Sequence, residues 1–249
     1  MPPAVQTMTR QPLHDWCGQA LVVGGGGIGR ALVPALERLA PGLQVHLATR
    51  NPRGSGEIRL DLCDDDSLAA LAQHVSQQFS PLRLVINTAG LLHGPRLQPE
   101  KRLSAVTRAQ LRESFELNAY GPILLARSLE SALPRELPSH FASLSARVGS
   151  IGDNRLGGWY AYRASKAAQN QLLHTLAIEW ARRLPLCCVS LLHPGTTATA
   201  LSEPFRGSVP AGRLLAPDQA ATALLAVLQQ REPAHSGGFW AWDGSAIPW

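Results

Sequence analysis

Near the start of the chain, residues 20–30 read Ala20-Leu21-Val22-Val23-Gly24-Gly25-Gly26-Gly27-Ile28-Gly29-Arg30. The short apolar run is typical of a buried strand, and the residues after Gly29 have helical periodicity. Gly24, Gly26 and Gly29 match the GxGxxG spacing, in which small residues let the backbone approach a pyrophosphate at a helix N-terminus. The order of strand, glycines and helix predicts a dinucleotide-binding turn with these contact residues: Gly24, Gly26, Gly27, Ile28 and Gly29.

The rest of the chain continues the alternation of strands and helices. Strands are predicted at 20–23, 44–48, 57–60, 82–87, 140–144, 187–192 and 239–242, and helices at 29–39, 67–78, 108–133, 160–183 and 217–229. Such alternation predicts βαβ units around a parallel sheet. We therefore expect an α/β fold, a single doubly wound Rossmann-like domain with a seven-stranded parallel sheet flanked by helices.

Length and composition favour one domain. A chain of 249 residues with 45% hydrophobic content can bury one large core. No internal repeat, low-complexity tract or break in composition divides it. We expect a loose N-terminal tail over residues 1–18 and a single dinucleotide-binding and catalytic domain over residues 19–249.

The composition argues against several other classes of protein. The net charge of +5 comes from scattered arginines without a basic run, which argues against a nucleic-acid-binding protein. Four cysteines without zinc or disulfide spacing, and the lack of an export signal or a bilayer-spanning stretch, favour a reduced protein of the cytoplasm. The histidines are dispersed and the run Asp64–Asp66 precedes a predicted helix, where it would cap, so no metal site is predicted.

The end of the second predicted strand bears on the choice of cofactor. A dinucleotide enzyme that prefers NAD usually has a carboxylate here for the ribose 2′-hydroxyl, whereas residues 48–51 read Ala-Thr-Arg-Asn. Arg50 offers a planar, bidentate donor to a 2′-phosphate, with Arg30 and Arg53 as candidate helpers. The sequence favours NADP(H) over NAD(H), and the alternative for Arg50 is a solvated surface arginine.

Tyr162 and Lys166 lie four residues apart on one face of the long predicted helix 160–183. A phenol with its ordinary pKa of about 10 is a poor acid or base at neutral pH, and a neighbouring cation lowers that pKa. Lys101 and Lys166 are the only lysines in the chain, so this spacing seldom arises by chance. The pair predicts acid–base chemistry at Tyr162.

In combination, these features resemble the short-chain dehydrogenase/reductase family. The resemblance runs from about residue 20 to the C-terminus, and residues 145–151 and 157–162 are most similar to its sniffer and C-factor-like carbonyl reductase branch. Besides the glycine turn, the matching pieces are Asp61-Leu62, Asn87-Thr88-Ala89-Gly90, Asn118, Tyr162 with Lys166, and His193-Pro194-Gly195 leading to Thr199.

The resemblance implies a role for each matching residue. Tyr162 would exchange a proton with the substrate oxygen, Lys166 would bind the nicotinamide ribose, and Asn118 would hold a water of a proton relay. The implied contacts around the adenosine and central strand are Asp61, Leu62, Asn87, Ala89 and Gly90, and those around the nicotinamide are Pro194, Gly195, Thr196 and Thr199. The resemblance also implies a homodimer or homotetramer that acts on a small-molecule carbonyl or alcohol.

Two positions depart from the family pattern. Val23 stands where the first glycine of the usual TGxxxGxG turn belongs, so this turn is one residue shorter. Ala146 stands at the position of the family's catalytic serine, three residues before Gly149. Neighbouring strand residues point to opposite faces, but an irregular strand end would bring Ser145 or Ser150 to the substrate. Ser145 is the first candidate.

The sequence thus predicts an NADP(H)-dependent oxidoreductase that transfers hydride between nicotinamide and a carbonyl or secondary alcohol. Ala146 leaves an alternative open, a cofactor-binding sensor or signalling protein with weak or absent catalysis. A nucleotide-sugar dehydratase or epimerase is disfavoured, because the chain after Thr199 is short for an added substrate domain. The sequence does not identify the substrate.

Overall fold

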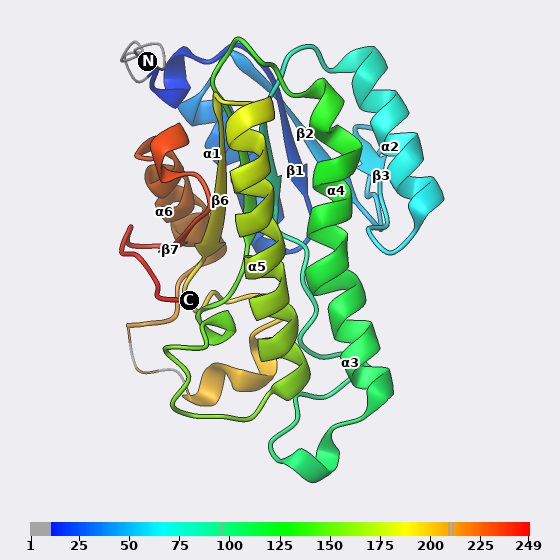
Figure 1. The fold of residues 1–249 in the computed structure, drawn as a ribbon, viewed down its shortest axis with the longest axis vertical. Coiled ribbons are helices and arrows are strands. Elements are labelled where there is room, and N and C mark those ends of the chain that lie inside the picture. The colour runs from blue at the N-terminus through cyan, green and yellow to red at the C-terminus, as the bar shows by residue number, and fades with distance from the viewer. Residues whose placement is uncertain (1–10, 96, 209, 211) are drawn as a thin grey trace.

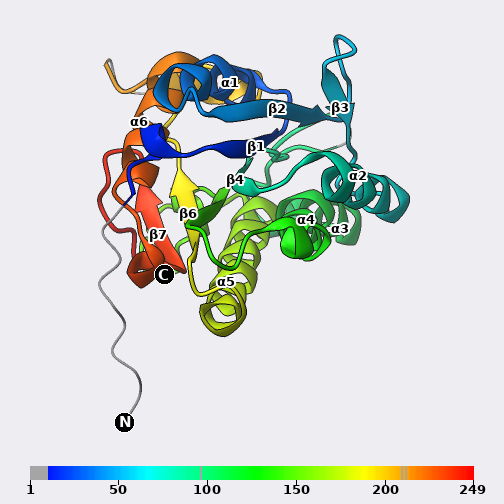
Figure 2. The same cartoon turned by 90° about the horizontal axis from the view of Figure 1, so that it is seen from above.

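A seven-stranded parallel sheet with helices on both faces organises the computed structural model, which describes residues 11–95, 97–208, 210 and 212–249 (Figures 1 and 2). The strand order is β3-β2-β1-β4-β5-β6-β7. The strands are β1 (Gly18–Val23), β2 (Leu43–Thr49), β3 (Glu57–Arg59), β4 (Leu82–Asn87), β5 (Ser139–Leu144), β6 (Cys187–His193) and β7 (Gly238–Ala241). This architecture confirms the predicted fold class.

The helices divide between the two faces of the sheet. They are α1 (Gly27–Leu39), α2 (Asp65–Gln78), α3 (Arg108–Phe115), α4 (Gly121–Leu129), α5 (Tyr160–Arg183) and α6 (Pro217–Gln229). Figure 2 shows α1 and α6 on one face, with α2, α4 and α5 on the other. In the part of the chain that the structure describes, no helix is long and apolar enough to cross a bilayer.

Side chains of β1 alternate between two hydrophobic cores, one on each face. Leu21 and Val23 pack with buried side chains of α2, α4 and α5, whereas Ala20 and Val22 pack with those of α1 and α6. Every residue of β4 and β5 is buried. Burial on both faces explains why β4 carries the unbroken apolar run Leu84-Val85-Ile86 and not an alternating pattern.

The order of the strands places a crevice next to β1. The chain crosses from β1 to β2 on one side of β1 and later enters β4 on the other side. At the carboxyl ends, Gly24 N donates to Ala48 O at 2.8 Å and Thr88 N donates to Val23 O at 2.7 Å. In sheets of this kind, the connections diverge where the order reverses, and ligands bind there.

The predicted helix over 108–133 contains an irregular centre. A π-helical turn, Glu116–Tyr120, separates α3 from α4, and a 3₁₀ turn, Glu130–Ala132, ends the element. The π turn carries Asn118, whose side-chain amide bonds both backbone groups of Leu91. Wide turns of this type recur at functional sites, because they shift one side chain out of the regular helical position.

The expectation of a loose tail over residues 1–18 is wrong for residues 11–18, and residues 1–10 lie outside the described residues. Leu13 and Trp16 are buried, and β1 already begins at Gly18. The Trp16 ring lies 4.4 Å below the Arg83 guanidinium and stacks on His140 at 5.5 Å. An indole in this setting gains both apolar burial and a cation–π contact, which the mixed polar sequence did not reveal.

Replacement of Trp16 by alanine tests this packing. We expect Trp16→Ala to lower the free energy of unfolding by about 3–5 kcal/mol, because a fully buried indole leaves a cavity. Urea unfolding followed by circular dichroism would measure it. His14→Ala, at an exposed neighbouring position, is the control and should change stability by less than about 0.5 kcal/mol. An equally small effect at Trp16 would contradict the packed segment.

Candidate active site

Two cavities of about 720 and 220 Å³ adjoin beyond the carboxyl ends of β1 and β4. Gly26, Ala89 and Gly90 line both, so the two form one cleft. We call them the large cavity, which extends from the glycine turn to Asp61, and the small cavity, which extends from the glycine turn to Tyr162.

The glycine turn presents a helix N-terminus to the cleft. A Cβ on Gly29 would lie 1.9 Å from Gly24 O, so only glycine allows the end of β1 to approach α1 this closely. Gly24 itself has φ 109°, and a Cβ on Gly26 would meet only open space. The first N–H groups of a helix have no intrahelical partner. The shortened turn therefore fits a diphosphate group, which such N–H groups and the helix dipole attract.

The structure brings most of the predicted site residues to this cleft. The predicted residues that line the large or the small cavity are Gly24, Gly26, Gly27, Ile28, Gly29, Arg50, Asp61, Leu62, Ala89, Gly90, Ser145, Tyr162, Lys166, Pro194 and Thr199. Four others lie outside the lining: Asn87, Asn118, Gly195 and Thr196. The three 2′-phosphate candidates Arg30, Arg50 and Arg53 all line the large cavity.

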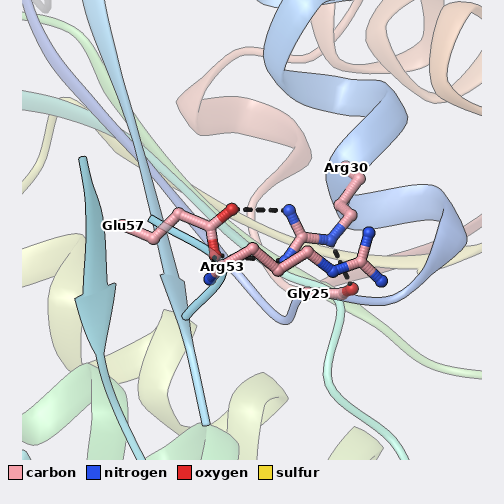
Figure 3. Close-up of polar contacts among 4 residues, drawn as sticks. All are labelled: Gly25, Arg30, Arg53 and Glu57. Carbon is pink, nitrogen blue, oxygen red and sulfur yellow. Dashed lines mark hydrogen bonds and ion pairs between the residues drawn. The ribbon is translucent and has the colours of Figure 1, made fainter. Parts of the chain in front are cut away.

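Arg30 is ion-paired with Glu57 (Figure 3). Its Nη1 and Nη2 donate to Glu57 Oε1 at 2.5 Å and Oε2 at 3.1 Å, and its Nε donates to Gly25 O at 3.0 Å. The hydrogen bonds from Arg30 lower the pKa of Glu57 to about 2, and the same contact raises the pKa of Arg30. Among the described residues, the side chains of Arg50 and Arg53 form no hydrogen bond or ion pair.

The loops after β3 and β4 shape the wall of the large cavity. Asp61 Oδ1 accepts from Cys63 N at 3.0 Å, which holds the turn after β3. Asn87 is fully buried, and its Nδ2 donates to Ser143 Oγ at 2.9 Å while its Oδ1 accepts from Ala89 N at 3.1 Å. Asn87 thus supports the loop that carries Ala89. Its side chain lies beneath that loop and does not face the cleft.

Tyr162 and Lys166 meet at the small cavity on one face of α5. Both are buried, and the Lys166 ammonium lies 6.0 Å from the centre of the Tyr162 ring. Lys166 Nζ donates to Leu144 O at 2.9 Å and to Gln169 Oε1 at 2.8 Å. Burial lowers the pKa of Lys166 to about 7 and raises the pKa of Tyr162. Burial therefore opposes the lowering of the tyrosine pKa that a neighbouring cation produces.

Asn118 is held close to this pair by the π turn. Its Oδ1 accepts from Leu91 N at 2.8 Å, and its Nδ2 donates to Leu91 O at 2.8 Å and to Ser165 Oγ at 3.1 Å. A Cβ on Gly90 would lie 3.7 Å from both Asn118 Oδ1 and Lys166 Nζ, so the two groups flank Gly90. The role of Asn118 in holding a relay water stays a prediction.

Of the two serines considered for the place of Ala146, the structure brings Ser145 to the small cavity. The chain leaves β5 after Leu144 and turns into a 3₁₀ helix, Arg147–Gly149, which begins directly after Ala146. Ser145 is buried, and its Oγ donates to Asn170 Oδ1 at 2.6 Å. Ser150 Oγ instead accepts from Asp153 N at 3.0 Å within the following loop.

The sequence did not predict several polar residues that lie around the site. Gln169 bonds both Lys166 and Ser143, and Asn170 bonds Ser145. Both lie on the buried face of α5, where polar residues among apolar ones signal internal hydrogen bonding. The buried carboxylate of Glu100 accepts from Ala161 N at 3.2 Å and so caps the first turn of α5. No local pattern links Glu100 to that helix.

A family model described as short chain dehydrogenase matches residues 19–208. The chain is 31% identical over 195 residues to 1-hydroxy-2-glutathionyl-2-methyl-3-butene dehydrogenase of Rhodococcus sp. (strain AD45), which covers 76% of this chain and 78% of that protein. It is 32% identical over 147 residues to C-signal of Myxococcus xanthus, and the aligned region covers 59% of this chain and 83% of that protein.

The architecture is shared with solved structures of other proteins. The NADPH-bound carbonyl reductase from chicken fatty liver has a TM-score of 0.80 and 25% identity, with 94% of this chain and 100% of that chain covered. The carbonyl reductase Sniffer of D. melanogaster has a TM-score of 0.77 and 23% identity, with 92% and 99% covered, and shows the likeness of fold alone. The family model spans most of the chain, and together with these relatives it shows that the chain belongs to the short-chain dehydrogenase family of oxidoreductases.

Proposed function

We propose that the protein is an NADP(H)-dependent enzyme that transfers hydride between nicotinamide and a carbonyl or secondary alcohol. The observation that carries the proposal is the meeting of Tyr162, Lys166 and the glycine turn at the small cavity. An acid–base group thus lies next to the turn that fits a diphosphate. The carbonyl reductase with NADPH among the similar structures supports the choice of cofactor and of reaction.

Residues along the cleft would hold the cofactor from end to end. The N-terminus of α1 would bind the diphosphate, and Arg50 with Arg53 would bind the 2′-phosphate. The adenosine would lie against Asp61, Leu62, Ala89 and Gly90, and the nicotinamide end would lie against Pro194 and Thr199. Gly195 and Thr196, which lie outside the lining, would support the loop between those two residues. When bound, the cofactor supplies or accepts the hydride.

Tyr162 would act as the proton donor in the direction of reduction. Because burial raises its pKa, the phenol keeps its proton until a substrate oxygen develops negative charge. The O–H bond of Tyr162 then breaks and the substrate oxygen takes the proton. Lys166, with a pKa of about 7, would return a proton to the phenolate, through the relay that Asn118 supports. The hydroxyl of Ser145 would turn from Asn170 Oδ1, to which it donates in this structure, and donate to the same substrate oxygen.

Location and assembly are further parts of the proposal. The composition favours the cytoplasm, and family membership favours a homodimer or homotetramer. A small-molecule substrate would meet the nicotinamide end of the cofactor at the small cavity, where Tyr162 and Ser145 lie. Among the described residues, no cluster of three or more His, Cys, Asp or Glu side chains could hold a metal ion.

Tyr162→Phe tests the proton donor. We expect turnover of aldehydes, ketones and quinones with NADPH to fall by about 10²–10⁴, while the NADPH dissociation constant changes less than about twofold. The matched control is Tyr160→Phe, at an exposed tyrosine of the same helix, which should keep its activity. Turnover that persists in Tyr162→Phe would remove this residue from the mechanism.

Arg50→Ala tests the recognition of the 2′-phosphate. Loss of hydrogen bonds to a charged group should weaken NADPH binding by about 10- to 100-fold and leave NADH binding nearly unchanged. Fluorescence titration with both nucleotides measures the ratio. Arg59→Ala, which removes an exposed arginine outside the cleft, is the control. Unchanged discrimination in Arg50→Ala would exclude Arg50 as the determinant.

The pH dependence of stability tests the burial of Lys166. Because its pKa falls from 10.5 to about 7 on folding, the unfolded chain binds more protons than the folded chain between these values. Stability should therefore rise with pH above 7, by on the order of 1 kcal/mol per pH unit from this group.

The measurement compares unfolding of the cofactor-free protein at pH 7 and pH 8.5 with that of Lys166→Met. The variant should lose this part of the rise, whereas Lys101→Met, at an exposed lysine, should retain it. An identical pH dependence in wild type and Lys166→Met would show that the lysine is solvated in the folded protein.

A further inference from the structure

We infer that Glu57 restrains the binding of a 2′-phosphate in the large cavity by neutralising Arg30, and thereby sets how strongly the cleft discriminates NADP(H) from NAD(H). The inference rests on the proposed function, and it assigns a specificity-determining role to a residue outside the cleft lining. Glu57 belongs to β3, whereas Arg30 belongs to the first turn of α1.

Arg30 lies at the cavity, but the carboxylate of Glu57 already neutralises its positive charge. Figure 3 shows both Glu57 carboxylate oxygens turned towards the Arg30 guanidinium. Arg30 lines the large cavity together with Arg50 and Arg53, and Glu57 does not. Of the five N–H donors of an arginine, Arg30 uses three, two on Glu57 and one on Gly25 O.

The pairing reduces what Arg30 can offer to a phosphate. The two remaining N–H groups can still donate, but the pair as a whole carries no net charge. The Arg30 and Glu57 side chains are only 24% and 17% exposed, so water screens the pair incompletely. Neither Arg50 nor Arg53 forms such a hydrogen-bonded ion pair among the described residues, although Arg53 also interacts electrostatically with Glu57. A 2′-phosphate would therefore meet Arg30 with its charge already matched, whereas Arg50 and Arg53 lack a hydrogen-bonded carboxylate partner.

Glu57 has a second contact that yields a competing expectation. Its Oε2 accepts from Arg53 N at 2.9 Å, so the carboxylate also ties the loop between β2 and β3 to α1. If Glu57 served only to hold this loop, which carries Arg50 and Arg53, its loss would weaken NADPH binding more than NADH binding. If it neutralises Arg30, its loss strengthens NADPH binding selectively. The ratio of the two affinities separates these roles.

The experiment measures dissociation constants of NADPH and NADH for wild type and Glu57→Gln by nicotinamide fluorescence. Glutamine keeps the size of the side chain and removes its charge. We expect Glu57→Gln to bind NADPH about three- to tenfold more tightly, with NADH changed less than about twofold. The gain should shrink at high salt, because it arises between partly exposed charges.

Two further variants isolate the cause. Glu37→Gln removes one negative charge from an exposed position of α1 and should leave the ratio unchanged, which controls for net charge. Arg30→Met in the Glu57→Gln background should abolish the gain. A ratio that is unchanged or lower in Glu57→Gln overturns the inference while the proposed function stands. Failure of the wild-type protein to bind either nucleotide would overturn both.

Discussion

The close approach between the end of β1 and the first turn of α1 is the constraint on which the site depends. Because a Cβ on Gly29 would collide with Gly24 O, glycine at this position lets the helix begin directly at the cleft. That start directs unpaired N–H groups towards the space between β1 and β4, where the reversal of strand order opens a crevice. The strand order opens the crevice, and the glycine spacing keeps side chains out of it. Tyr162 and Lys166 border the cavity that results.

The sequence predicted the parts of the structure that local chemistry determines. The bounds of β4, α5 and α6 were predicted to the residue, since apolar runs and helical periodicity mark them without ambiguity. The seven strands follow from the same signal. Residues that lie within a few positions of a strand end, such as Arg50 and Asp61, line the cleft as the alternation implies. The assignment of their roles rests on family resemblance and stays a prediction.

Long-range contacts explain what the sequence did not show. Trp16 is buried because Arg83 and His140, far along the chain, surround its ring. Glu57 pairs with Arg30, which lies 27 positions earlier in the chain. Glu100 caps α5 at Ala161, which lies 61 positions later. Ser145 lies at the small cavity directly after the end of β5, and its partner Asn170 comes from α5, 25 positions away. Each case joins segments whose pairing only the folded backbone determines.

The π turn between α3 and α4 also has a geometric consequence. Each residue of a regular α-helix advances by about 100° around its axis, so one additional residue rotates everything beyond it. Here α3 packs against α5, whereas α4 packs against both α2 and α5. The π turn rotates α4 about the helix axis relative to α3 without an intervening loop. The two helices can therefore pack against different neighbours although they are continuous.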